Sequence, residues 1–213
     1  RFGGHFIDNF SSLAQTTDSG YILGGSSLSE IGGDKTQGSR GAYDYWIVKT
    51  DVTGVKQWDK RFGGKGNDFM SFVQQTTDGG YILGGNSSSG MGGDKSQGSR
   101  GDDDYWIVKV DANGIKQWDK RFGGTSADYL SALQQTSDGG YILGGSSASG
   151  MGGDKTEAGR GSFDYWVIKV DANGVKQWDK RFGGTNWDQL SALQQTKDGE
   201  YILGGYSYSG IGG

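Results

Sequence analysis

The chain has 213 residues, 43 of them Gly, and contains no Cys and no Pro. The lack of Cys excludes a disulfide framework and a thiolate metal site, and the lack of Pro excludes a collagen-like helix. A net charge of −4 argues against a surface that tracks nucleic-acid phosphates, and no apolar run is long enough to span a membrane. We therefore expect neither a nucleic-acid partner nor membrane insertion.

A repeat with a period of 60 residues organises the chain. The tetrapeptide Arg-Phe-Gly-Gly starts at positions 1, 61, 121 and 181, and 41 of 60 positions are identical between 61–120 and 121–180. Such self-similarity is typical of proteins built from one recurring supersecondary unit. The sequence predicts one repeat array over 1–213, with repeats 1–60, 61–120 and 121–180 and a partial repeat 181–213.

Each repeat carries signals for two β-hairpins. In the first hairpin, Asp-Gly or a close variant separates two strand-like runs, because Gly accepts the positive φ of a tight turn. The second hairpin has Asn-Gly or Thr-Gly near the end of its turn. First hairpins are expected near 11–27, 71–87, 131–147 and 191–207, and second hairpins near 45–62, 105–122 and 165–182. No sustained helical periodicity is present, so helices should be few.

Four antiparallel strands per repeat predict an all-β fold of β-propeller blades, with about 3.5 blades in this chain. The apolar run 45–48 suits a strand covered on both faces, which predicts that Trp46, Trp106 and Trp166 are buried. The doublet Gly24-Gly25, present in every repeat, predicts a close approach between backbones. A β-solenoid is the alternative, although its coils are shorter.

The repeat resembles known families. The run 104–118 is similar to the strand-turn-strand of pyrroloquinoline-quinone-type propeller blades, and Tyr-Ile-Leu-Gly-Gly resembles the glycine doublet of kelch blades. The whole unit resembles repeats in secreted and surface proteins of Bacteroidota, often exported by the type IX system. This resemblance implies a β-propeller and an extracellular or bacterial cell-surface location, and it implies no particular activity.

The count of hairpins is uneven, since four first hairpins stand against three second hairpins. An open propeller end leaves strand edges that favour association. We therefore expect the rest of a longer chain, or other subunits, to complete the propeller.

The long loop that follows the first hairpin is the main candidate for a ligand-binding site, because long loops are often functional. Polar residues recur in it at fixed offsets: Asp34, Arg40, Asp44, Asp94, Arg100, Asp104, Asp154, Arg160 and Asp164. One interpretation is a repeated pocket for a glycan, a peptide or Ca²⁺, with one cluster per blade. The other is structural, with Arg100 paired to Asp104 or Asp94 to pin the loop.

Tryptophans offer a second possibility. The sets at 46, 106, 166 and at 58, 118, 178 are sugar-stacking platforms or blade core, and their strand patterns favour the core. Trp187 breaks the repeat pattern and is the better candidate for an exposed aromatic side chain in a binding site.

Catalytic signals are few. His5 is the sole histidine, and no nucleotide-binding or metalloprotease motif occurs. We expect no enzyme activity and no cofactor; the abundance of Asp keeps Ca²⁺ open as a structural metal, and the sequence decides nothing about metals.

These observations favour a non-enzymatic repeat module that binds a glycan or a surface protein. The alternative is a structural spacer or secreted cargo array without a ligand. A propeller hydrolase or a quinone-dependent dehydrogenase is a third possibility, supported by fold resemblance alone.

Overall fold

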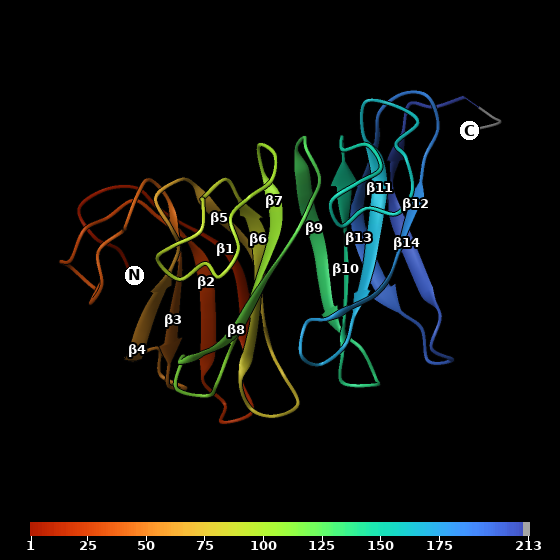
Figure 1. Ribbon diagram of the computed structural model, residues 1–213. Helices are drawn as coiled ribbons and strands as arrows, with labels where there is room; N and C mark the ends of the chain where they lie inside the picture. Colours follow the sequence, from red (N-terminus) through yellow and green to blue (C-terminus); the bar gives the residue numbers. More distant parts are fainter. Residues whose placement is uncertain (211–213) are drawn as a thin grey trace. The chain divides into compact units, whose positions relative to one another are not determined.

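The computed structural model describes residues 1–210 and shows 14 β-strands and no helix among them (Figure 1). Residues 211–213, the end of the expected fourth repeat, lie outside the described residues. The all-β prediction is confirmed. No helix within 1–210 is long and apolar enough to cross a membrane.

The strands recur at the same positions in every repeat. The first strands are β1 (Asp8–Gln15), β5 (Asp68–Gln75), β9 (Asp128–Gln135) and β13 (Asp188–Gln195). The second strands are β2 (Tyr21–Ser27), β6 (Tyr81–Ser87), β10 (Tyr141–Ser147) and β14 (Tyr201–Ser207). The third strands are β3 (Asp44–Thr50), β7 (Asp104–Val110) and β11 (Asp164–Val170). The fourth strands are β4 (Lys56–Phe62), β8 (Lys116–Phe122) and β12 (Lys176–Phe182).

The strands form four-stranded antiparallel sheets of the kind found in propeller blades. The sheets have the orders β1-β2-β3-β4, β5-β6-β7-β8 and β12-β11-β10-β9, and β13 and β14 form a two-stranded sheet. In the first sheet, Tyr21 pairs with Thr50 and Ser27 pairs with Asp44. The two hairpin turns of a sheet therefore lie at one end, and the long loop 28–43 and its equivalents 88–103 and 148–163 leave the other end.

The turns follow the predicted chemistry. Gly79 and Gly54 have φ values of 82° and 84°, in the left-handed region that glycine tolerates. In the first repeat, Ser19 occupies the turn position that Gly79 occupies in the second. Its φ is 66°, and it is the one non-glycine residue with positive φ in the described chain. Asp18 Oδ1 accepts the Gly20 N–H at 3.1 Å, which closes that turn with a side chain.

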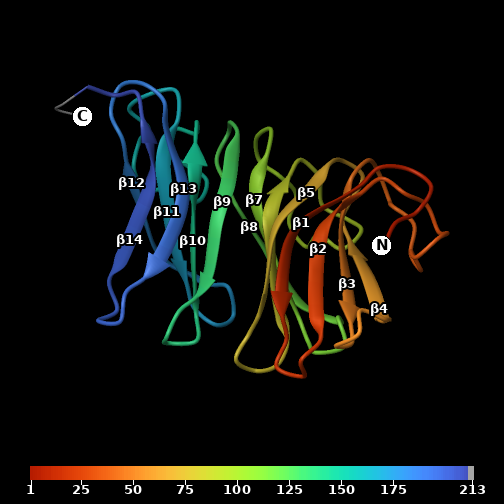
Figure 2. The ribbon, with the colours of Figure 1, turned by 180° about the vertical axis from the view of Figure 1, so that it is seen from behind.

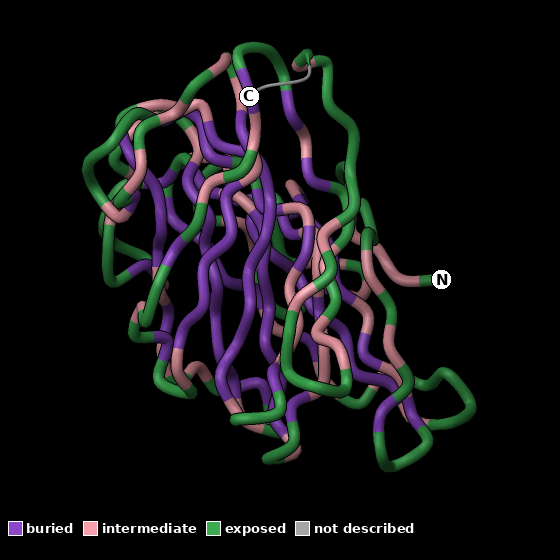
Figure 3. The backbone as a smooth tube through the Cα atoms, turned by 90° about the vertical axis from the view of Figure 1, so that its right-hand side faces the viewer, coloured by how far each residue is buried: buried purple, intermediate pink, exposed green. Residues whose placement is uncertain are grey.

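The chain divides into two compact units. Unit 1 comprises Arg1–Ser99 and Trp106–Lys120, and unit 2 comprises Arg100–Tyr105 and the described residues from Arg121 onward. Within unit 1, β5 packs on β1, β2 and β3, and Figure 2 shows β5 beside β1. Within unit 2, β13 packs on β9, β10 and β11 in the same way. Buried positions follow the strands, whereas the turns and long loops are largely exposed (Figure 3).

The tryptophans of the third strands are core residues, as predicted. Trp46, Trp106 and Trp166 are at most 1% exposed. The indole N–H of Trp46 donates to Asp59 Oδ2 at 3.0 Å, so the polar edge of the ring is satisfied inside the sheet.

The glycine doublet allows two close approaches, of which the one at Gly25 confirms the predicted approach between backbones and the one at Gly24 is to a side chain. A Cβ on Gly25 would lie 1.8 Å from the Asn9 carbonyl oxygen, where the register of β1 and β2 shifts between Phe10 and Ser12. A Cβ on Gly24 would lie 2.2 Å from the Met70 methyl of the next repeat. One glycine therefore accommodates a β-bulge, and the other accommodates sheet-on-sheet packing.

Candidate functional site

Two aspartates of the long loops, Asp94 and Asp154, form ion pairs between consecutive repeats. Asp94 Oδ2 lies 2.9 Å from Arg40 Nη1 and 2.8 Å from Arg61 Nη1, and it accepts the Gly63 N–H at 3.1 Å. The carboxylate therefore fastens the second repeat's loop to the end of β4 in the first repeat.

The same arrangement occurs in unit 2. Asp154 lies 3.0 Å from Arg100 and 2.7 Å from Arg121. The guanidinium of Arg100 thus pairs with an aspartate of the following repeat. The expected ion pair with Asp104 or Asp94 in its own loop was wrong. Arg100 contacts Asp104 through its backbone N–H, which donates at 2.7 Å. The reason is geometric, because each loop lies against the preceding repeat.

Three further candidates, Asp34, Arg160 and Asp164, take part in hydrogen bonds that involve the backbone. Asp34 accepts the Gly3 N–H at 3.0 Å. Arg160 is exposed, and its backbone N–H donates to Asp164 at 2.7 Å. Backbone hydrogen bonds thus hold these residues, and ion pairs hold Asp94 and Asp154, which supports the structural interpretation of the loop residues.

Asp44, Asp104 and Asp164 are fully buried. Asp44 accepts the Arg40 N–H at 2.7 Å and lies 3.6 Å from Arg61 Nε, and its Oδ1 has no hydrogen-bond partner among the described residues. Burial raises the pKa of Asp44 to about 6, against the opposing effects of the Arg40 N–H and the Arg61 charge. These carboxyls are enclosed groups that a soluble ligand cannot reach.

The recurring lysine of the loop is buried too. Lys35 Nζ donates to Ser27 Oγ at 2.5 Å and lies 5.5 Å from the Trp46 ring centroid. Burial lowers the pKa of Lys35, because the charged amine loses hydration. Lys35 therefore stabilises the fold and is not available to a ligand.

Trp187 is exposed at 42%, in line with the sequence expectation. Its ring lies 4.7 Å from the Phe163 ring, and its N–H donates to Gln189 Oε1 at 3.3 Å. The geometry is that of a surface aromatic pair. No group of three or more His, Asp or Glu residues within 1–210 is placed to hold a metal ion.

A cavity in unit 1 is a stronger candidate. It has a volume of about 490 Å³ and opens at the end of the sheets that carries the hairpin turns. It is lined by Thr17, Asp18, Lys49, Gln57, Trp58, Gln75, Gly79, Tyr81, Ala112 and Asn113. Its size lies in the range of small-molecule sites, about 300–1,000 Å³. We call it the Trp58 pocket.

The polar wall of the Trp58 pocket is a connected network. Lys49 Nζ lies 2.8 Å from Asp18 Oδ2 and donates to Gln57 Oε1 at 3.1 Å. Gln75 Oε1 accepts the Thr17 N–H at 2.8 Å. These bonds hold the carboxylate and two side-chain amides in place before any ligand arrives.

The aromatic wall consists of Trp58, which is half-buried, and Tyr81, which is buried. Their rings meet edge to face, with centroids 5.9 Å apart and an interplanar angle of 67°. The turn after β7 lies against the indole: a Cβ on Gly114 would be 3.0 Å from Trp58 Cζ3, and the φ of Gly114 is 73°. Glycine at this position therefore lets the Ala112–Asn113 turn approach the ring.

The charges of the pocket are fixed at neutral pH. The hydrogen bond from Lys49, followed by those from Thr16 and Gly20, holds the pKa of Asp18 well below its usual range. Burial, together with the Asp18 charge, raises the pKa of Tyr81 to about 12. Neither group titrates near neutrality, so the pocket offers stable donors and acceptors rather than a proton-transfer pair.

Part of this arrangement recurs in unit 2. Lys169 lies 2.9 Å from Asp138 and donates to Gln177 at 3.2 Å, and the rings of Trp178 and Tyr201 are 5.8 Å apart. In the described part of this unit no turn covers Trp178 as the Gly114 turn covers Trp58. Asp18, Lys49 and Gln57 were not among the predicted site residues, because they are separated along the chain. Their exact recurrence beside the second tryptophan set was the available signal.

Comparison with known proteins gives little more. No family model and no curated protein matches the chain. Among solved structures, the chain is similar to a protein of unknown function from Bacteroides caccae, with a TM-score of 0.47 and 9% sequence identity. The similarity covers 91% of this chain and 52% of that protein, so the chain spans about half the length of its structural neighbour.

Proposed function

We propose that this chain is a non-enzymatic, saccharide-binding module of a secreted or cell-surface protein, and that the Trp58 pocket is its binding site. The observation that carries the proposal is that a half-buried indole lines one cavity together with Asp18, Lys49 and Gln57.

The chemistry of the pocket matches a sugar ring. Saccharide hydroxyls both donate and accept hydrogen bonds, as the amides of Gln57, Gln75 and Asn113 do. The apolar C–H face of a sugar packs on an aromatic face, which Trp58 provides. Because the paired Asp18 and Lys49 cancel in charge, a neutral saccharide suits the pocket better than a strongly charged one.

The extracellular or bacterial cell-surface location is part of the same proposal. It is supported by the resemblance of the repeat to secreted and surface proteins of Bacteroidota. Type IX export belongs to the proposal on the same ground.

The test is binding of the whole chain to a glycan array, followed by titration of the best saccharide. We expect Trp58→Ala to weaken binding about tenfold or more, since ring stacking and buried area are both lost. Trp187→Ala is the matched control, because Trp187 is an exposed tryptophan that does not line the pocket, and the binding of this variant should equal that of the unchanged chain. An array without signal, or equal losses in both variants, would favour the spacer alternative.

A second candidate, protein binding through the long loops, rests on a separate observation. At one loop position, Ile31, Met91 and Met151 are 69%, 78% and 72% exposed. Flexible Met side chains adapt to varied protein surfaces. A Met91→Ser/Met151→Ser variant that loses a partner captured by the unchanged chain, while keeping its glycan signal, would support this candidate.

A further inference from the structure

Among the described residues, β14 has a neighbouring strand on one edge only, whereas the equivalent strands β2, β6 and β10 are paired on both edges. All seven residues of β10 are buried, whereas β14 has none that is buried. Ile202 is 65% exposed, and its equivalent Ile142 is 0% exposed. In the full sheets, β2 and β10 each pair with a third strand; β14 pairs with β13 only, within the described residues.

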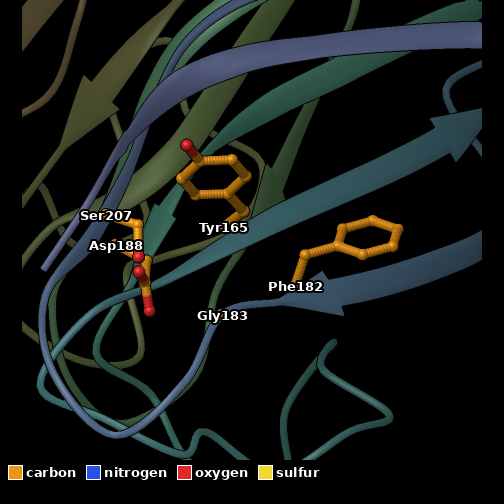
Figure 4. Close-up of a pocket in the computed structure, with 5 residues that line it drawn as sticks. All are labelled: Tyr165, Phe182, Gly183, Asp188 and Ser207. Atoms are coloured by element: carbon orange, nitrogen blue, oxygen red, sulfur yellow. The ribbon is translucent and has the colours of Figure 1, made fainter. Parts of the chain in front are cut away.

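A cavity lies next to this edge. It has a volume of about 230 Å³ and is lined by Tyr165, Phe182, Gly183, Asp188 and Ser207. Figure 4 shows the Tyr165 ring with the Asp188 and Ser207 side chains on one side and the Phe182 ring on the other. A second, more apolar cavity of about 290 Å³ lies along Val167, Trp178 and Leu203.

In unit 1 the corresponding positions are covered by a third strand. Ile47, Phe62 and Leu83 form one core cluster with Trp106 and Val108 of β7. Tyr45 Oη donates to the Trp106 carbonyl at 2.9 Å, and in unit 2 Tyr105 Oη donates to the Trp166 carbonyl at 3.2 Å. Tyr165 Oη instead lies 3.5 Å from the Tyr206 carbonyl oxygen.

Arg181 gives a second indication that a segment can bind at this edge. Arg61 and Arg121 each bond the aspartate of the following long loop, Asp94 and Asp154. Arg181 Nη1 instead donates to the nearby Gly183 carbonyl at 2.9 Å. A segment that covers this edge would therefore bring both an aspartate for Arg181 and a tryptophan for the cavity beside Tyr165.

We propose that the β14 edge and the Tyr165 cavity form a docking surface for one kind of partner: a long loop and β-hairpin of this repeat's own type, with the pattern of residues 34–62. The tryptophan of that hairpin fills the cavity, and its third strand pairs with β14 in the register of β2 with β3. In that register Gly205 faces the tryptophan, as Gly25 faces Trp46, and Ile202 faces the lysine, as Ile22 faces Lys49.

A folded second copy of the chain does not suit this role. In residues 1–210 every hairpin of this type is already paired with its own second strand. The partner is therefore a hairpin without a sheet of its own. Main-chain pairing supplies affinity in such strand addition, and the alternate side chains supply specificity.

The test uses the whole chain and a synthetic peptide with the sequence of residues 34–62. We expect saturable binding by calorimetry, at least about tenfold weaker for the Trp46→Ala peptide, because the anchor of the cavity is lost. The register is read by a disulfide between Ile202→Cys in the chain and Lys49→Cys in the peptide; the natural chain has no cysteine. A Val48→Cys peptide is the control, since a shift of one residue turns the side chain to the other face.

A covalent version guards against a peptide that fails to stay soluble. Residues 34–62 are appended after residue 213, and we expect Tm to rise by at least about 4 °C. The same extension carrying Trp46→Ala should lose most of that rise. The proposal is overturned if the two peptides bind equally, if both cysteine pairs cross-link equally, if the two extensions give the same Tm, or if the chain dimerises through the β14 edge and excludes the peptide.

Discussion

The carboxylate of Asp94 lies 2.8 Å from the guanidinium of Arg61, a residue of β4 in the preceding repeat. The loop of one repeat is thereby held by the sheet of another, and Arg121 and Asp154 repeat the contact in unit 2. A repeat stabilised in this way depends on its neighbour, as in other repeat proteins whose units contact only adjacent units.

This relationship predicts unequal effects for the two arginines that share Asp94. Arg61 is 8% exposed and also faces buried Asp44, whereas Arg40 is 37% exposed. Arg61→Ala should lower the free energy of unfolding by about 3–5 kcal/mol, because it leaves the buried Asp44 carboxyl without the guanidinium that faces it. Arg40→Ala, the matched change, should cost about 0–1 kcal/mol. Urea denaturation of both variants makes the comparison, and equal losses would contradict the assignment of Arg61 as the structural partner.

The glycine at the β-bulge is predicted to be irreplaceable by alanine. A Cβ on Gly85 would lie 2.0 Å from the Phe69 carbonyl oxygen, so Gly85→Ala forces the two strands apart. We expect a loss of stability of about 1–3 kcal/mol. Gly90→Ala is the control, because its Cβ would meet no atom within 4 Å. A Tm for Gly85→Ala equal to that of the control would show that the bulge relaxes freely.

The sequence predicted most of the fold because the signals were local and repeated. Turn glycines, the Gly24-Gly25 doublet and the buried Trp46 position all follow from short-range patterns. The partners of the loop arginines could not be predicted in this way, because each contact joins residues of different repeats. The Trp58 pocket could not be predicted for the same reason: its wall combines three turns and four strands of two repeats.

Replacing a buried tryptophan by alanine should cost more stability than replacing an exposed one. Trp46 is enclosed, lies under Lys35 and donates to Asp59, so Trp46→Ala leaves a cavity and removes one hydrogen bond of that carboxylate. We expect a cost of about 3–5 kcal/mol. Trp187→Ala removes a surface ring and should change stability by less than about 1 kcal/mol. Thermal denaturation monitored by circular dichroism distinguishes the two, and a small effect at Trp46 would contradict its place in the core.

Asp44 gives a prediction about pH. Its pKa is raised from 3.8 to about 6 in the folded protein, chiefly by burial, so folding favours the protonated carboxyl. Its contribution to stability is fully present below about pH 4 and is lost as the pH rises through about 6, by at most about 3 kcal/mol. The lowered pKa of Asp18 acts in the opposite sense, since its contribution is lost only as the solution becomes strongly acidic.

The variant Asp44→Asn cannot ionise. Its free energy of unfolding relative to the unchanged chain should therefore increase between pH 4 and pH 6.5. Urea titrations at closely spaced pH values measure this difference. Parallel curves for Asp44→Asn and the unchanged chain would show that the buried carboxyl stays charged beside Arg61 throughout this range.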